Sequence, residues 1–340
     1  MTVVVLTTFG ACSQVDGNSS DGHLIERAGL AMGSELTVTA WTSDDAAATA
    51  AFDAVFREFE RLEGLMSVWR EGSDVERLNQ SAGLQPVRVS PEVREVLRAA
   101  HRVSEWTDGK FDITFGALFG LWKFDHDQDN RIPDRGEVQR QLSLIDYREV
   151  KVDEHAGTAF LERAGMRVHL GGIGKGYAID RAAALLVGRG VSDFIIKSGG
   201  DVYAAGRRGD RPWRLGIRDP RGPADSSFAA LDLADRTFST SGDYERFFVR
   251  DGVRYHHILD PDRGEPARGC RSVTIVTERA VIADGLSTGV FILGPAAGMA
   301  LIERLPDVEG VIVTDSNEVL VSSGLRDRLI RTAAPTRADQ

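Results

Sequence analysis

The spacing of apolar residues along the chain predicts several amphipathic helices. Within 44–66 the apolar positions recur every three or four residues, which places them on one helical face turned toward a core. A second helix begins at Ser90-Pro91, because serine is a favoured N-cap and proline is favoured at the first helical position. Gly109 closes that helix. Further helices are predicted over 175–188, 281–293 and 296–305, and from about Asp134.

Shorter stretches with strand-like patterns predict a sheet. Segment 194–196, the turn Ser198-Gly199-Gly200 and segment 202–203 indicate strand, turn and strand. Strands and helices do not alternate regularly, so the pattern favours an α+β fold with a largely antiparallel sheet over a doubly wound fold. No internal repeat is found. Other strands are predicted over 35–41, 213–218, 272–277, 311–314 and 319–322.

The composition limits the classes of protein to consider. The chain has 340 residues, 42% of them hydrophobic, which is enough for a sizeable core. Lys and Arg number 41 and Asp and Glu 51, so the net charge is −10, and no basic stripe indicates a nucleic-acid binder. No apolar run reaches the roughly 18 residues that a membrane-spanning helix needs. Residues 26–330 are expected to form one large domain, followed by a disordered tail over 331–340.

The first 25 residues are not expected to join the fold. Apolar residues 3–6 and the small pair Gly10-Ala11 precede Cys12, and residues 13–22 are polar like a flexible tether. This order is similar to the end of a bacterial lipoprotein signal, with Cys12 as the lipidated residue. No Lys or Arg occurs before Arg27, so the positive region that opens such signals is missing. An ordinary N-terminal segment with a free thiol is the alternative.

A glycine-rich turn precedes the helix predicted over 175–188. Four glycines surround Lys175 within 171–176, and such a turn at a helix N-terminus lets backbone groups approach a phosphate. The turn is not a Walker A loop, because Gly176 follows the lysine where that motif has Ser or Thr. A purely structural turn is the alternative, but a cation beside phosphate-facing backbone favours ligand binding.

Asp284 and Thr288 form the most informative pair. If 281–293 is a helix, they lie at positions i and i+4 and share one face. A carboxylate and a hydroxyl on one face suit a hard cation such as Mg²⁺, which keeps several waters and binds phosphate. The alternative is structural, with Asp284 as a helix N-cap and Thr288 bonded to its own backbone.

Two adjacent histidines, His256 and His257, precede the turn at Asp260-Pro261. On a strand their side chains point to opposite faces, so only one can serve a given site. Strand ends followed by turns are places where sites are often built. A packing or surface role is the alternative.

An acidic stretch resembles the start of an EF-hand loop, with Asp125, Asp127 and Asp129 at alternate positions. Asn130 stands where that loop needs glycine, and Gly136 stands where it needs a bidentate glutamate. A solvated acidic loop is therefore preferred to a calcium site.

Taken in order, these segments resemble the FAD:protein FMN transferase (ApbE) family over about 32–325. No single motif is decisive, but the ordered set is specific. The residues that carry the resemblance are Met32-Gly33-Ser34, Met66-Ser67, Arg77-Leu78-Asn79, Gly109-Lys110-Phe111-Asp112-Ile113-Thr114, Leu121-Trp122-Lys123-Phe124, Leu170-Gly171-Gly172-Ile173-Gly174-Lys175-Gly176-Tyr177, Gly199-Gly200-Asp201, Thr240-Ser241-Gly242-Asp243-Tyr244, His257-Ile258-Leu259-Asp260-Pro261, and Ala283-Asp284 with Thr288.

The resemblance implies a single large ApbE-like domain with an FAD site and a Mg²⁺ ion on the FAD pyrophosphate. It assigns the metal to Asp284, Thr288 and the backbone carbonyl of Gly172. It assigns contacts with FAD to Met32, Trp69, Lys110, Phe111, Asp112, His169 and Lys175.

The implied reaction transfers FMN from FAD to a threonine hydroxyl of a partner flavoprotein and releases AMP. His257 is the candidate general base, since an imidazole with a pKa of about 6.5 suits that role near neutrality. Lipoprotein members of the family act on flavin subunits of membrane redox complexes at the outer side of the cytoplasmic membrane. A lipid-anchored, periplasmic location is therefore expected.

Two positions depart from the family pattern. His169 stands where the family usually has an acidic residue, and Trp69 stands where it often has tyrosine. Imidazole can still form a hydrogen bond and indole can still stack on a ring, so the class of ligand is kept. Two other functions use the same residues: an FAD pyrophosphatase, in which water replaces the acceptor threonine, and a non-catalytic FAD-binding lipoprotein.

Overall fold

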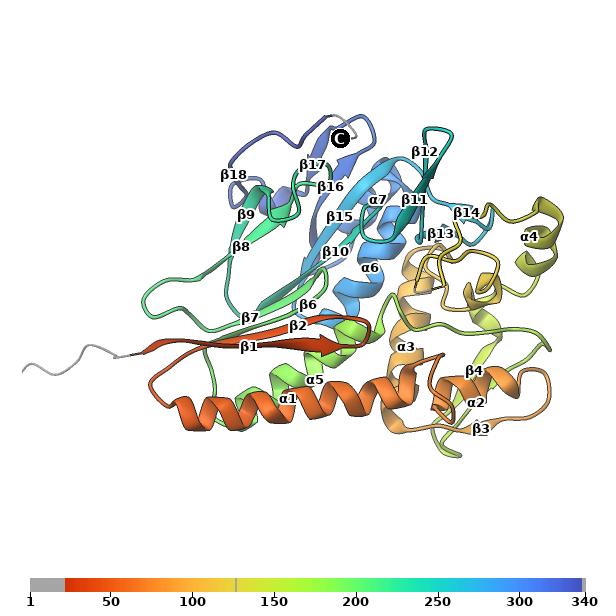
Figure 1. The fold of residues 1–340 in the computed structure, drawn as a ribbon, viewed down its shortest axis with the longest axis horizontal. Coiled ribbons are helices and arrows are strands. Elements are labelled where there is room, and N and C mark those ends of the chain that lie inside the picture. The colour runs from red at the N-terminus through yellow and green to blue at the C-terminus, as the bar shows by residue number, and fades with distance from the viewer. Residues whose placement is uncertain (1–21, 126, 338–340) are drawn as a thin grey trace, which may run out of the picture.

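The fold is built around one eight-stranded sheet, seen in the computed structural model that describes residues 22–125 and 127–337 (Figure 1). The strand order is β1-β2-β6-β7-β10-β15-β16-β17, and every neighbouring pair is antiparallel. The predicted α+β architecture is therefore confirmed. The strands are β1 (His23–Ala31), β2 (Ser34–Thr42), β6 (Phe194–Ser198), β7 (Asp201–Ala205), β10 (Arg236–Gly242), β15 (Cys270–Thr277), β16 (Glu309–Thr314) and β17 (Val319–Val321).

Helices cover one face of this sheet. Helix α5 packs between α1 and α6, and α6 lies against β10 and β15 (Figure 1). Helix α3 also packs on α6. The helices are α1 (Asp45–Met66), α2 (Asp74–Gln80), α3 (Pro91–Trp106), α4 (Arg135–Leu142), α5 (Gly174–Gly188), α6 (Ala280–Leu293) and α7 (Pro295–Arg304).

Small antiparallel sheets complete the molecule. One of them packs on the other face of the main sheet, where Trp213 and Phe228 join Val202, Phe238 and Val311 in a second buried cluster. The small sheets consist of β8 (Trp213–Arg218), β9 (Ser227–Leu233) and β18 (Ile330–Arg331); β3 (Val87–Arg88), β4 (Val150–Asp153) and β5 (Thr158–Leu161); β11 (Phe247–Arg250) and β12 (Val253–His256); and β13 (Leu259–Asp260) and β14 (Glu265–Pro266).

A third buried cluster, of aromatic rings, holds the β11–β12 hairpin in place. Phe248 stacks on Tyr255 within the hairpin, with ring centroids 5.2 Å apart. The same two rings stack on Phe124 and Trp122 at 5.7 and 6.0 Å. Stacked aromatic pairs add to the burial of apolar area. The hairpin is thereby fixed to the segment that follows α3, and the residues that flank the hairpin, Arg246 and His257, line the cavity.

The local signals in the sequence act as expected. Asp44 caps α1 by accepting from the Ala47 amide at 2.9 Å, and Ser90 caps α3 ahead of Pro91. Between β1 and β2 the chain turns through Met32 and Gly33, with φ of 50° and 70°. Two central residues with positive φ are typical of the turn that matches the twist of a two-residue hairpin.

The sequence did not predict the central strand β10. Its residues RTFSTSG show no apolar alternation, yet Thr237 and Ser239 are buried. They are tolerated there because each has a partner: the Thr237 hydroxyl donates to the Val202 carbonyl at 2.6 Å, and the Ser239 hydroxyl donates to Asp201. Strands β1, β9, β11 and β12 were also missed.

The fold reaches past both expected domain limits. Strand β1 begins at His23, inside the 25 residues set aside at the N-terminus. At the other end, β18 includes Arg331, and Thr336 donates from its amide and its hydroxyl to Asp219. The region 331–337 is thus packed against the body and is not the disordered tail that was expected. Cys12 lies outside the described residues.

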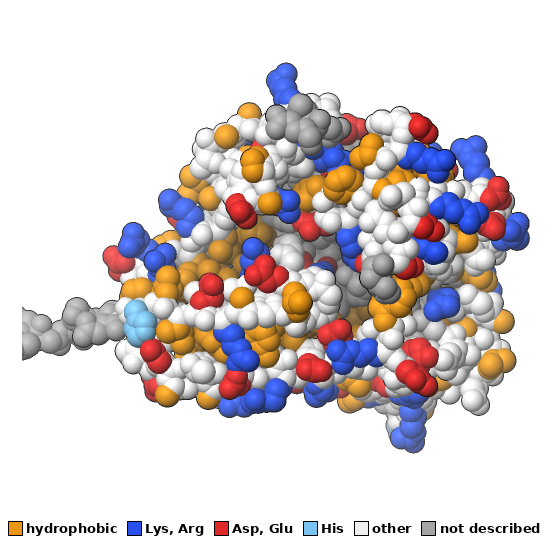
Figure 2. All heavy atoms as spheres, in the orientation of Figure 1, with side chains coloured by type: hydrophobic (Ala, Val, Ile, Leu, Met, Phe, Trp, Pro, Cys, Tyr) orange, Lys and Arg blue, Asp and Glu red, His pale blue; other side chains and the backbone are white. Residues whose placement is uncertain are grey.

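Among the described residues, no helix is long and apolar enough to cross a membrane. Lys and Arg side chains are interspersed with Asp and Glu on the face shown in Figure 2, with no basic stripe. The same face is hollowed beside the tip of the β1–β2 hairpin.

Candidate active site

A cavity of about 760 Å³ lies where the β1–β2 turn, the glycine-rich turn, the end of β10 and helix α6 meet. This volume is in the range of small-molecule sites. All eleven residues predicted to hold the metal, FAD or the proton line its wall, although they come from six separate stretches of chain. They are Met32, Trp69, Lys110, Phe111, Asp112, His169, Gly172, Lys175, His257, Asp284 and Thr288.

Asp284 and Thr288 lie one turn apart on α6 and face the glycine-rich turn. A Cβ on Gly172 would stand 3.6 Å from the Thr288 hydroxyl oxygen, so the turn lies directly against the threonine. The Gly176 amide donates to Asp284 Oδ2 at 2.9 Å. A Cβ on Gly176 would come within 2.2 Å of the Ala280 carbonyl, so only glycine allows α5 and α6 to approach this closely.

The Lys175 ammonium lies between two buried carboxylates, those of Asp201 and Asp284. It lies 2.9 Å from Asp201 Oδ2 and 3.7 Å from Asp284 Oδ1. Burial alone would lower the pKa of Lys175, but Asp201 and Asp284 outweigh it and raise the pKa above its ordinary value, so the ammonium stays charged. Burial, followed by the charge of Asp201, raises the pKa of Asp284, against the opposing effect of Lys175.

The oxygen groups of Gly172, Asp284 and Thr288 suit a hard cation. Seven carboxylates and only three basic side chains line the cavity, so a phosphate-containing ligand would meet excess negative charge unless a cation accompanied it. A carboxylate, a hydroxyl and a backbone carbonyl are the oxygen ligands that Mg²⁺ accepts while keeping several waters. Within the described residues no group of three or more His, Cys, Asp or Glu could hold a metal, so an all-side-chain cage is not formed there.

His257 follows β12 and lies in the cavity wall. Its Nδ1 is 3.3 Å from the Arg246 carbonyl, which can only accept, so Nδ1 carries the hydrogen and Nε2 keeps a free lone pair. Enclosure by the protein, reinforced by the Arg246 guanidinium, lowers the pKa of His257 well below 6.5. The imidazole is therefore neutral at neutral pH, as a general base must be.

His256 points the other way, into the core, and is 3% exposed. Its Nε2 donates to the Ala267 carbonyl at 3.0 Å and its Nδ1 accepts from the Ile258 amide at 3.3 Å. Both ring nitrogens are satisfied in the neutral form, and burial lowers the pKa of His256 to about 4. Of the two histidines only His257 lines the cavity, so the predicted opposite orientation of the pair is confirmed.

This burial makes stability depend on pH. The pKa of His256 is about 4 when folded, against 6.5 for the ordinary group, so the unfolded chain takes up the proton first and stability falls as pH drops below 6.5. We expect the unfolding free energy of the wild type to fall by about 2 kcal/mol, through His256 alone, when the pH is lowered from about 7.5 to about 5. Urea unfolding of the wild type and of His256→Gln at both pH values measures this. Equal losses in the two proteins would contradict the prediction.

Aromatic rings line the mouth of the cavity around His169. The imidazole lies 5.1 Å from the Phe119 ring, which in turn lies 4.8 Å from Trp69. His169 Nδ1 accepts from the Gly171 amide at 3.0 Å, and burial lowers the pKa of His169 to about 4. The ring is therefore neutral and offers a hydrogen at Nε2. Trp69 is 51% exposed at this mouth.

Lys110 and Asp112 hold their segment in place through an ion pair and hydrogen bonds with the rest of the protein. The Lys110 ammonium lies 2.9 Å from Asp260 and 2.7 Å from Asp262. Asp112 accepts from the Thr114 amide at 2.8 Å with one oxygen and from the Tyr147 amide at 2.8 Å with the other. Both side chains reach the cavity, but Asp112 uses its oxygens to fix the loop.

Two carboxylates of the acidic loop are paired with basic side chains. Asp125 forms an ion pair with Arg246, and Asp129 lies 3.3 Å from Lys123. Asp134 caps α4 by accepting from the Gly136 amide at 2.9 Å. These contacts give the loop carboxylates and the start of α4 structural partners.

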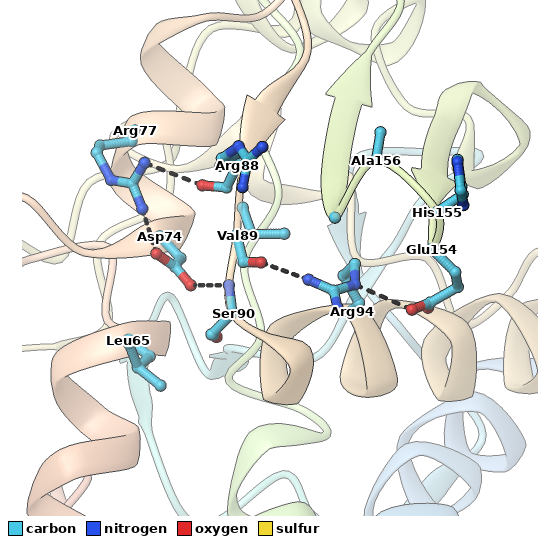
Figure 3. Close-up of a pocket in the computed structure, with 11 residues that line it drawn as sticks. Leu65, Asp74, Arg77, Arg88, Val89, Ser90, Arg94, Glu154, His155 and Ala156 are labelled. Carbon is cyan, nitrogen blue, oxygen red and sulfur yellow. Dashed lines mark hydrogen bonds and ion pairs between the residues drawn. The ribbon is translucent and has the colours of Figure 1, made fainter.

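A second hollow, of about 460 Å³, lies away from these residues beside α2 and α3 (Figure 3). Arg94 and Asp74, which line this hollow, form hydrogen bonds and ion pairs with neighbouring groups of the protein. Arg94 donates to the Val89 carbonyl at 2.6 Å and to Glu154 at 3.0 Å, and Asp74 accepts from the Ser90 amide at 2.6 Å (Figure 3). These bonds fasten the segment before α3, so the hollow has a structural explanation.

Sequence reasoning assigned no role to several residues in the cavity wall. Asp201 and Ser241 belonged to motifs of the family resemblance, but neither side chain was given a partner. Arg246 and Phe119 were not singled out at all. Only Asp201, a carboxylate directly after a glycine pair, carried a local signal that could have marked it.

Comparisons with known proteins identify the family to which this chain is similar. A model of the ApbE family matches residues 32–312. A Klebsiella pneumoniae (strain 342) protein named FAD:protein FMN transferase is 32% identical over 310 residues, covering 91% of this chain and 95% of that protein. A Treponema pallidum (strain Nichols) protein of the same name is 33% identical over 343 residues, covering 96% and 93%.

The fold has the same relatives. The ApbE protein of Thermotoga maritima superposes with a TM-score of 0.83 at 33% identity, covering 90% of this chain and 99% of that one. The flavin transferase ApbE of Vibrio cholerae superposes with a TM-score of 0.81 at 26% identity, with the same coverage. The chain belongs to the ApbE family.

Proposed function

We propose that this protein is a Mg²⁺-dependent FAD:protein FMN transferase that attaches FMN to a threonine hydroxyl of a partner flavoprotein and releases AMP. The observation that carries the proposal is the single cavity that joins the Asp284–Thr288 pair, the glycine-rich turn and a neutral His257. The names of the relatives support the flavin donor and the protein acceptor.

The metal would be held by Asp284, Thr288 and the Gly172 carbonyl. When bound, Mg²⁺ neutralises charge on the pyrophosphate and stabilises the leaving AMP. Lys175 keeps a permanent positive charge at the same corner, held in place by Asp201 at 2.9 Å. Trp69 and His169 offer aromatic faces to the planar rings of FAD at the mouth of the cavity.

His257 accepts the proton of the incoming hydroxyl at Nε2, since Nδ1 is bonded to the Arg246 carbonyl. The threonine oxygen then forms a bond to the phosphorus on the FMN side, and the bond from that phosphorus to the bridging oxygen breaks. The AMP phosphate leaves with the electron pair. Phosphoryl transfer of this kind depends on positioning and charge neutralisation more than on covalent chemistry by the protein.

The place of action is part of the same proposal. A lipid on Cys12, followed by the polar tether over 13–22, would keep the domain near a membrane surface. The acceptor would be a flavin-carrying subunit of a membrane redox complex, and the enzyme would face the periplasm or the outer surface of the cell. Mass spectrometry of the membrane fraction, with lipid attached at Cys12 or absent, tests this part alone.

The decisive experiment measures two products in one tube. A candidate acceptor domain is incubated with the protein, FAD and Mg²⁺, and the acceptor mass and AMP are both quantified. A mass gain equal to FMN, matched by AMP, is expected. AMP with free FMN and no gain on any acceptor tested would favour the pyrophosphatase. Bound, intact FAD without AMP would favour a binding protein.

A further inference from the structure

Behind Thr288 lies a chain of hydroxyl groups that ends on a backbone carbonyl. Thr288 Oγ1 is 3.0 Å from Ser241 Oγ, and Ser241 Oγ is 2.8 Å from Ser287 Oγ. Ser287 Oγ is in turn 2.9 Å from the carbonyl oxygen of Asp284. Ser287 is fully buried, so this end of the chain has no access to water.

The direction of every hydrogen in this series of hydroxyls follows from its last acceptor, the Asp284 carbonyl oxygen. A carbonyl oxygen only accepts, so the single hydroxyl hydrogen of Ser287 points to Asp284. Ser287 must then accept from Ser241, which uses the only hydrogen of Ser241. Ser241 must in turn accept from Thr288.

A neighbouring hydroxyl does not disturb this order. Ser239 lies 3.3 Å from Ser287, but the Ser239 hydrogen is donated to the carboxylate of Asp201, which only accepts. Ser239 therefore offers no hydrogen to the chain. The order Thr288 to Ser241 to Ser287 to Asp284 is the arrangement that satisfies all three hydroxyl donors.

The consequence concerns the face of Thr288 that lines the cavity. Its hydrogen is turned toward Ser241, away from the cavity, so its oxygen presents lone pairs to whatever binds beside Asp284. An unrestrained threonine would be free to turn its hydrogen toward the ligand. Groups that orient metal ligands in this way contribute strongly to affinity in other sites.

We infer that Ser241 and Ser287 are positioning residues that lock the Thr288 hydroxyl as an acceptor for the divalent cation. The inference rests on the proposed function, because that function places the cation at Asp284 and Thr288. It adds β10 to the metal site, a strand from which no metal ligand was predicted. It also gives a role to the buried Ser287 of α6, a helix whose other buried residues are mostly apolar.

The test measures cation binding directly, without turnover. Mn²⁺ is titrated into the full chain in the absence of FAD, and the free ion is followed by electron paramagnetic resonance. Ser241→Ala is expected to bind Mn²⁺ about 10–100-fold more weakly than the wild type, which is the usual cost of removing such a group. Ser241→Thr keeps the hydroxyl and should restore most of the affinity. Ser287→Ala should weaken binding in the same direction.

Thr274→Val is the matched control. It removes the Thr274 hydroxyl of β15, which lies 2.9 Å from the Thr240 hydroxyl of β10. This pair of hydroxyls has no link to Thr288. Thermal unfolding of each variant separates a loss of binding from a loss of fold. Wild-type affinity in a folded Ser241→Ala would overturn the inference alone. Unchanged binding in Asp284→Ala would overturn both the inference and the metal site of the proposed function.

Discussion

Replacing Asp284 with asparagine should abolish the Mg²⁺ dependence of FMN transfer and lower the rate by about 10³-fold, since a metal ion supplies several kcal/mol to such transition states. The substitution removes the only carboxylate proposed to bind the cation. Its amide oxygen can still accept from Gly176, as Asp284 Oδ2 does at 2.9 Å. The loss should therefore appear in the rate and in the Mg²⁺ titration, while the melting temperature stays close to that of the wild type.

A matched control lies on the same helix pair. Asp180 is a partly buried carboxylate between α5 and α6, and it accepts from the Ala280 amide at 2.7 Å, but it does not line the cavity. Asp180→Asn should keep its Mg²⁺ dependence even if its stability falls. Stopped-flow or discontinuous measurement of AMP release across a Mg²⁺ series compares the two. If Asp284→Asn still responds to Mg²⁺ like the wild type, the metal lies elsewhere.

Replacing His257 with alanine should lower the transfer rate by about 10²–10⁴-fold, the usual contribution of a general base, with little change in FAD affinity. His257 Nδ1 is anchored on the Arg246 carbonyl at 3.3 Å, which leaves Nε2 as the proton acceptor. Single-turnover transfer and a separate FAD-binding titration measure the two effects. Added imidazole should partly restore the rate, because the vacated space borders the cavity.

The pH profile of the wild type gives an independent check on this role. Burial, followed by the charge of Arg246, lowers the pKa of His257 well below 6.5. A base with a lowered pKa stays neutral to lower pH, so kcat/KM should hold its plateau down to pH 6.5 and fall only below it. His101→Ala, a change at a surface histidine 43% exposed, should leave the profile unchanged. A His257→Ala variant with near-normal turnover would remove the base from the mechanism.

The sequence alone determined most of the helices, although not α2, and the chemistry that each segment can offer. Three- and four-residue spacing located α1 and α3, and the caps Asp44 and Ser90 set where they start. The spacing of Asp284 and Thr288 placed them on one face before any fold was known. These are local properties, because the geometry of a helix depends only on neighbouring residues.

The central strand is where local pattern failed. Strand β10 contains threonine and serine at buried positions, which ordinarily indicates a loop. Its polar groups are acceptable because Val202 and Asp201, on the adjacent strand β7, receive their hydrogens. A partner more than thirty residues away in sequence leaves no trace in the periodicity of the strand.

The tertiary structure alone decided how the segments meet. It explains why His257 lines the cavity and His256 does not, because β12 ends at His256 and turns that ring into the core. It placed Lys175 between two carboxylates and set Ser241 behind Thr288. The directions of protons and the shifts in pKa arise from such contacts between distant segments. The sequence therefore identified which groups could act, and the order of the strands in the sheet determined which of them act together.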